Sequence, residues 1–178
     1  MTRPISRRHL IAGGAGAAGA AMVPVGGRLA ASSHLPPLKG ELVILRQPLR
    51  VFDTRDPDNF FGRKLADGDT VAVSVGAASG GEFMTGVFVN VTITQTEGAG
   101  FITVRDFFTG DDFSDDDSPP PITTSNLNWT SNDVTLANMT LSPVGAENSI
   151  EVICSGVGAA THVLVDVQGY VPFEFEDS

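Results

Sequence analysis

The feature that most constrains the fold is an alternation of apolar and polar residues with a period of two. The runs GVFVNVTIT and THVLVDVQGY show it most clearly. Successive side chains of a β-strand point to opposite faces, so both runs predict half-buried strands. The buried faces are expected to hold Val87, Val89, Val91 and Ile93 in the first run, and Val163, Val165 and Val167 in the second. The opposite face of the second run holds His162, Leu164, Asp166, Gln168 and Tyr170.

Similar runs recur along the chain between Gly, Pro, Asn and Asp residues, without helical periodicity of useful length. Strands are expected at residues 42–46, 50–53, 70–75, 86–94, 100–105, 123–128, 134–142, 149–154 and 161–170. Glycine-rich segments at 76–81 and 97–100 predict turns. About nine short strands joined by such turns predict an all-β fold, a β-sandwich or jelly roll, preceded by a signal segment.

The first 31 residues have the layout of an export signal rather than of a folded element. A basic start is followed by a weakly apolar run rich in Gly and Ala, and SRRHLI places Arg7 and Arg8 in the twin-arginine pattern. An ordinary Sec signal with two arginines by chance is the alternative. We therefore expect a signal peptide at 1–31, a linker at 32–40 and a β-domain at 41–173. The expected destination is outside the cell or at its surface, by way of the twin-arginine export machinery, with no membrane span after processing.

Charge excludes one class of partner. Removing the signal would take four arginines away, so 11 basic residues become seven against 21 acidic ones, a formal charge of −14. A chain this acidic is repelled by nucleic acid, and no nucleic-acid partner is expected. The 147 residues that remain suit one domain with a sizeable core.

Patterns of catalytic and metal-binding residues are missing from the sequence. The single cysteine, Cys154, excludes an internal disulfide and lies in the strand-like run SIEVICSG, where a buried thiol is expected. His162 and Asp166 share a strand but would lie roughly 13 Å apart at ~3.3 Å per residue, too far to pair. No catalytic residue, cofactor or metal ion is expected. A glycosidase that pairs distant carboxylates is the enzymatic alternative.

An aspartate-rich segment at 109–121, TGDDFSDDDSPPP, is predicted to be an exposed and mobile loop. Its acids repel one another and its prolines cannot join a β-ladder. Calcium binding is the alternative interpretation, because carboxylates are calcium ligands. The spacing does not follow the D-x-D-x-D-G pattern of a calcium loop.

The run RVFDTRD at 50–56 predicts a charged network. Asp53 and Arg55 share a face if the run is a strand, and Asp166 lies on another strand-like segment. A guanidinium held between carboxylates is the usual way to place charge inside a β-domain. We expect these three residues to form an internal structural network, and an Arg55 that faces a ligand is the alternative.

Asparagines interrupt the strand-like segment TSNLNWTSNDVTLANMTL, although asparagine is depleted in strands. Their side chains can bond backbone groups at the corners of a β-domain, which is the structural interpretation. The functional one is a glycan site at Asn126, Asn128 and Trp129, because an indole can stack on a sugar ring. A Trp129 packed inward would be an ordinary core aromatic instead.

The order of short motifs resembles a β-domain family that is common in secreted actinobacterial proteins. The motifs are RVFDTR, an L-x-x-G-x-x-V-x-V segment at 65–73, VFVNVTIT, GFITV, SNLNW, ANMTLSPVG and VLVDVQGYV, which together span residues 50–171. The family occurs alone, in tandem or beside exported enzymes, and has no assigned activity. The resemblance therefore implies no catalytic residues, and it implies that the asparagines belong to the fold. The aspartate-rich insertion before Ile122 and the run IEVICSG depart from the family pattern.

These observations predict a secreted, non-catalytic β-domain that acts as a cell-surface or extracellular binding or structural module. A cell-wall glycan or a surface protein is the expected partner. A secreted glycan-active hydrolase that uses carboxylates is one alternative, and a subunit of a surface assembly is the other.

Overall fold

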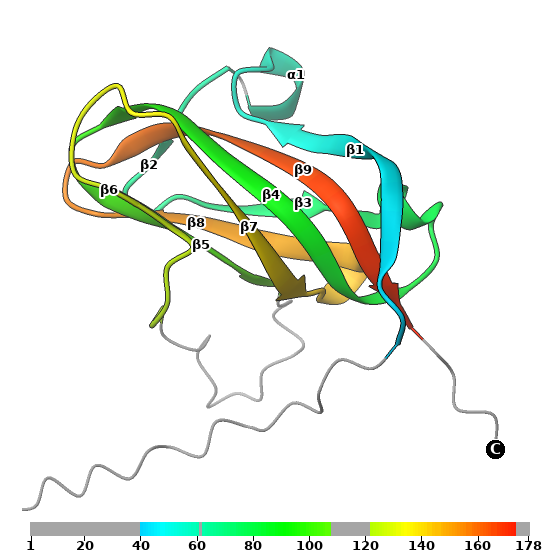
Figure 1. Ribbon diagram of the computed structural model, residues 1–178. Coiled ribbons are helices and arrows are strands. Elements are labelled where there is room, and N and C mark those ends of the chain that lie inside the picture. The colour runs from blue at the N-terminus through cyan, green and yellow to red at the C-terminus, as the bar shows by residue number, and fades with distance from the viewer. Residues whose placement is uncertain (1–39, 61, 108–121, 174–178) are drawn as a thin grey trace, which may run out of the picture. The chain divides into compact units, whose positions relative to one another are not determined.

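The structure is a computed structural model that describes residues 40–60, 62–107 and 122–173. These residues form an all-β domain of nine strands in two antiparallel sheets, as predicted (Figure 1). The predicted signal at 1–31, the linker up to residue 39 and the acidic segment at 109–121 lie outside the described residues. No helix in the described ranges is long and apolar enough to cross a membrane.

The larger sheet has the strand order β1-β9-β4-β7, and a two-residue strand, β2, pairs with the start of β9. Their bounds are β1 (Val43–Asp53), β2 (Leu65–Ala66), β4 (Met84–Glu97), β7 (Leu136–Pro143) and β9 (Ala160–Pro172). The smaller sheet has the order β3-β8-β5-β6. Its strands are β3 (Thr70–Ser74), β5 (Gly100–Asp106), β6 (Leu127–Trp129) and β8 (Ser149–Ser155). The short helices are α1 (Pro57–Phe60), η1 (Gly76–Ser79) and η3 (Ala146–Asn148).

The core lies between the two sheets and is built by the alternation seen in the sequence. The predicted inward residues of β4 and β9 are buried: Val87, Val89, Val91, Ile93, Val163, Val165 and Val167. The smaller sheet contributes Ile102, Val104, Ile150, Val152 and Cys154 to the same cluster. The predicted buried faces of β4 and β9 are therefore confirmed. Their period of two arises because successive side chains of a strand point to opposite faces.

A β-bulge in β9 overturns one expectation about its outer face. Phe88 pairs with Gly169 but Val89 pairs with Val167, so Gln168 is an extra residue. An extra residue moves every later side chain to the other face. Tyr170 therefore lies opposite Val87 and packs against the core, and its predicted position on the face of His162 is wrong.

Several observed elements differ from the predicted ones. The runs at 42–46 and 50–53 belong to one irregular strand, β1, whose pairing with β9 shifts register twice. The two-residue strand β2 and the helix α1 were not predicted, and β6 is shorter than the run at 123–128. The turn at 97–100 carries the chain from the larger sheet into the smaller one, because β4 and β5 belong to different sheets.

Candidate functional site

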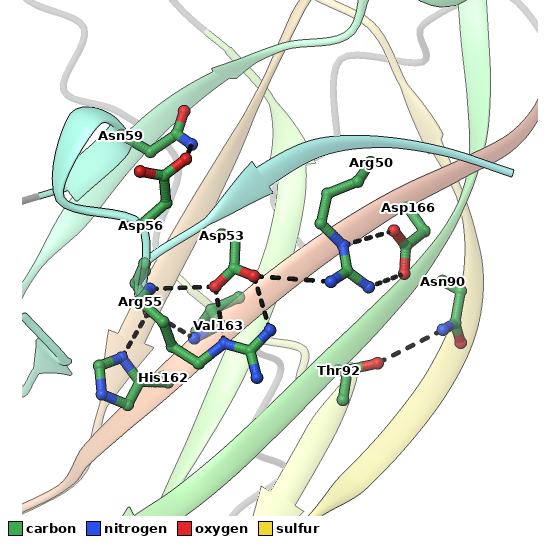
Figure 2. Close-up of polar contacts among 11 residues, drawn as sticks. Arg50, Asp53, Arg55, Asp56, Asn59, Asn90, Thr92, His162, Val163 and Asp166 are labelled. Carbon is green, nitrogen blue, oxygen red and sulfur yellow. Dashed lines mark hydrogen bonds and ion pairs between the residues drawn. The ribbon is translucent and has the colours of Figure 1, made fainter. Parts of the chain in front are cut away.

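Four charged side chains meet on the outer face of the larger sheet (Figure 2). Arg55 donates two hydrogen bonds to the carboxylate of Asp53, at 2.9 and 2.7 Å. Arg50 donates two to Asp166, at 2.8 and 2.9 Å, and its Nη1 lies 3.5 Å from Asp53 Oδ2. The structure thus brings the three predicted residues into one network, but the link to Asp166 is Arg50, which the sequence interpretation did not include.

The network lies at the surface, so the predicted interior position is wrong. The side chains of Arg50 and Arg55 are each 46% exposed, whereas those of the two aspartates are mostly buried. A second bulge, at Val51, explains why Arg50 joins the network, because it puts Arg50 and Asp53 on the same face although they are three residues apart. The bonds from Arg55 hold the pKa of Asp53 below its ordinary value.

The DTRD segment forms the turn that ends β1 and begins α1. The hydroxyl of buried Thr54 accepts a hydrogen bond from the N–H of Val163 at 3.0 Å, and the Thr54 N–H donates to the Val163 carbonyl at 3.0 Å. Asp56 accepts bonds from the N–H of Asp58 and from the side chain of Asn59, as an N-cap does. The polar groups of this motif thus hold strand β9 and the helix in place.

His162 is tied to the same turn. Its Nδ1 lies 2.9 Å from the hydroxyl of Thr54, which can donate to a neutral ring because it already accepts from Val163. Burial lowers the pKa of His162, and the positive charges of Lys64 and Arg55 add to the effect. This environment favours the neutral imidazole near pH 7 and fits a structural rather than a catalytic histidine.

Two of the asparagines join the sheets of the sandwich. Asn126 accepts a hydrogen bond from the N–H of Val104 at 2.7 Å and donates to the hydroxyl of Thr140 at 3.1 Å. Asn138 donates to the carbonyl of Asn126 at 2.8 Å. Because Val104 belongs to the smaller sheet and Thr140 to the larger, these amides brace the two layers where they meet.

Trp129 packs inward and is only 4% exposed. Its indole N–H donates to the carbonyl of Glu97 at 3.2 Å. A buried ring cannot stack on a sugar, so the glycan alternative for Trp129 is excluded and the other alternative, a core aromatic, is confirmed. Asn128, one residue earlier, points to the opposite side, is exposed, and donates to the hydroxyl of Ser125 at 2.9 Å.

A shallow groove of about 240 Å³ opens beside Asn128 on the outer face of the smaller sheet. Phe101 lies directly opposite Asn128 in the β5–β6 register, and residues Thr123, Thr124 and Ser125 complete the wall with Ile122. The groove thus combines a half-buried aromatic ring with an amide and hydroxyl groups. The sequence interpretation missed Phe101, although its alternation with buried Ile102 in GFITV places its side chain on the outer face.

The surroundings of Cys154 disfavour its reactive thiolate form. Burial raises the pKa of the Cys154 thiol to about 12, helped by the nearby charges of Asp69 and Asp67. A thiol in this state is a poor nucleophile at neutral pH. The described residues contain no group of three or more His, Cys, Asp or Glu side chains that could hold a metal ion.

Comparison with known proteins adds no assignment. No protein-family model matches the chain, and no curated protein matches it. The resemblance carried by the short motifs therefore remains a prediction, and the groove beside Asn128 is the best defined place for a ligand on the outer face of the smaller sheet.

Proposed function

We propose that the protein is a secreted, non-catalytic β-domain that binds glycans at the cell surface or outside the cell. The observation that carries this proposal is the groove of Phe101 and Asn128. An aromatic ring offers a flat apolar face to the C–H groups of a sugar, and amides and hydroxyls can both donate to and accept from sugar hydroxyls. The groove brings these two kinds of group together at one place.

The size of the groove sets the kind of glycan binding that we expect. Its volume of about 240 Å³ lies below the roughly 300–1,000 Å³ of pockets that enclose a drug-sized ligand. We therefore infer that it takes one ring of a polysaccharide that otherwise lies across the sheet. A single site of this kind binds weakly. Weak binding suits an exported module whose ligand is a repetitive cell-wall polymer, because such a polymer offers many equivalent sites.

Five paired carboxylates among the described residues support a non-catalytic role over the hydrolase alternative. Asp53 and Asp166 are held by arginines, and Asp69 accepts bonds from Arg63 and from a backbone N–H. Glu151 and Glu97 are paired with Arg105 and Lys64. A general acid needs a raised pKa, whereas the bonds from Arg55 lower the pKa of Asp53.

A glycan array followed by calorimetry with the best polysaccharide tests the proposal. Replacing Phe101 or Asn128 by Ala should weaken binding about tenfold, which corresponds to about 1.4 kcal/mol. Phe88→Ala and Asn90→Ala are the matched controls, because both residues lie on the outer face of the larger sheet. Absence of binding to any glycan would refute the proposal, and turnover of a glycan by the purified protein would favour the hydrolase.

The export part of the proposal rests on Arg7 and Arg8, which lie outside the described residues. The twin-arginine route carries folded proteins, which agrees with a domain that needs no disulfide. Replacing both arginines by Lys should leave the precursor inside the cell, as an immunoblot of cell fractions would show. Normal secretion from a strain without the twin-arginine machinery would instead assign the signal to the Sec pathway.

A further inference from the structure

A second, larger pocket is lined by residues at the start of β4 and just after the end of β9. Figure 1 shows these two strand ends. Its volume is about 390 Å³, and its walls include Phe83, Met84, Gly145, Glu147 and Phe173. The N–H of Phe173 donates to the carbonyl of Phe83 at 2.9 Å, which holds the two aromatic residues side by side. This pocket is separate from the groove of Phe101 and Asn128, which lies on a sheet face.

Large apolar side chains are exposed around this pocket. Phe83 is 70% exposed and Phe173 is 48% exposed, in a chain with few aromatic residues. Leu42 and Ile44, at the start of β1, are also exposed, and Val43 and Ile44 pair with Tyr170 and Gly169, three and four residues before Phe173. Single exposed apolar residues are ordinary, but a cluster of them around a hollow marks an interaction surface.

The charges at this end are of one sign. Glu147 lines the pocket and Glu82 lines the hollow that adjoins it through Phe83 and Phe173. No lysine or arginine is among the lining residues that the structure describes. Aromatic faces attract cations as carboxylates do, so the rings and the glutamates favour the same kind of ligand.

The walls are held in position by Asn148. Its side-chain oxygen accepts from the N–H of Met84 at 3.2 Å, and its amide donates to the carbonyl of Glu82 at 3.0 Å. Its own carbonyl accepts from the N–H of Val75 at 2.8 Å. One residue thus connects the loop before β4 to the turn after β7, so the pocket is formed before a ligand arrives and binding requires little ordering.

We propose that this pocket docks a lysine side chain from an otherwise apolar segment of a partner protein. The four methylene groups of a lysine stem can pack between Phe83 and Phe173 while the ammonium group reaches Glu82 and Glu147. The apolar neighbours of that lysine would cover the exposed side chains at the start of β1. The proposal adds a protein partner at one end of the domain to the glycan site on the sheet.

The test uses the purified protein and the peptide acetyl-Ala-Val-Lys-Val-Ala-amide as the probe. Its counterpart with norleucine in place of lysine keeps the stem and removes the charge. Calorimetry should show the lysine peptide binding at least tenfold more tightly. Amide NMR shifts should change at Gly145 and Ala146, which line the pocket.

Variants and matched controls localise the binding. The double change Glu82→Gln and Glu147→Gln, and separately Phe83→Ser, should each weaken the lysine peptide at least tenfold. Asp58→Asn in α1 and Met139→Ser in β7 are the controls, because they remove an exposed acid and an exposed apolar residue elsewhere. Equal unfolding temperatures of variants and wild type would show that the fold is intact.

Three results would overturn the proposal. If the two peptides bound with equal affinity, the pocket would bind the apolar stem alone and would have no selectivity for the ammonium group. Failure of the lysine peptide to bind at millimolar concentration would mean that the pocket takes no such ligand. A concentration-dependent dimer that Phe83→Ser abolishes would assign this surface to a second copy of the chain.

Discussion

The substitution Asn126→Ala separates the structural from the functional interpretation of the asparagines. In the structure the Asn126 side chain accepts from the N–H of Val104 and donates to the hydroxyl of Thr140. Alanine can make neither bond, and Val104 is only 8% exposed, so its N–H would lose its acceptor in a largely buried place. Asn128→Ala is the matched control two residues along the chain, because its amide is exposed and bonds only Ser125 among the described residues.

The size of the effect follows from burial. A buried N–H left without a partner costs about 1–3 kcal/mol, and the bond to Thr140 contributes about 1 kcal/mol. We therefore expect Asn126→Ala to lower the free energy of unfolding by roughly 2–4 kcal/mol. The exposed amide of Asn128 should contribute about 0.5 kcal/mol or less, as is usual for surface substitutions.

Urea unfolding followed by the fluorescence of Trp129 measures both variants. The indole is buried in the folded state and is the only one in the chain, so its emission reports the loss of the core. The midpoint for Asn126→Ala should fall well below those of wild type and Asn128→Ala, with a similar dependence on urea. Overlapping curves for the two variants would refute the bracing role of Asn126 and return it to the candidate ligand site.

The charged groups allow three further predictions. Replacing Arg50 or Arg55 by Ala should shift the unfolding temperature by no more than about 3 °C, because exposed ion pairs contribute little; a much larger loss in a thermal melt would mean a buried network. The lowered pKa of His162 means that the unfolded chain takes up its proton first, so stability should fall as the pH drops below about 6.5. A His162→Gln variant should show a smaller difference in unfolding temperature between pH 7.5 and pH 5, and an unchanged difference would contradict this assignment. Cys154, with its pKa raised to about 12, should resist a thiol reagent at pH 8 until urea unfolds the protein, and rapid labelling of the native protein would show that the thiol is accessible.

The strands were predictable because apolar and polar residues alternate with a period of two along a half-buried strand. β4 and β9 show this in Val87, Val89 and Val91 and in the valines of the second run, and each of these side chains is buried. The bulges were not predictable, because an extra residue such as Val51 or Gln168 carries no signature of its own in a single sequence. The error about the face of Tyr170 and the missed link through Arg50 each follow from one of these two positions.

The candidate site was only partly predictable for a related reason. Asn128 was recognised as a candidate, but Phe101 lies 27 positions earlier and meets it only through the register of β5 and β6. Register between strands depends on the whole sheet rather than on either run. Trp129 could not be placed from its sequence position alone, since the end of a strand is compatible with either face.

The motifs behind the family resemblance lie at joints of the sandwich. Thr54 of DTR closes the end of β1 onto β9, and Asn126 of SNLN braces the two layers. A Cβ atom at Gly145 of PVG would lie 1.9 Å from the carbonyl oxygen of Phe107. One at Gly169 of DVQGY would lie 2.4 Å from that of Val43, so neither position accepts a side chain without a shift of the backbone.

These requirements belong to the scaffold and hold whatever the domain binds. Motif residues such as Thr54 and Asn126 cannot specify a ligand, because their polar groups are already used inside the fold. Selectivity must come from residues between the motifs or at their outer faces. In this protein we propose that those are Phe101 and Asn128 on the smaller sheet, and Phe83 with Glu147 at the end of the domain. Exchanging these positions between two such domains should exchange their ligands and leave their stability nearly unchanged.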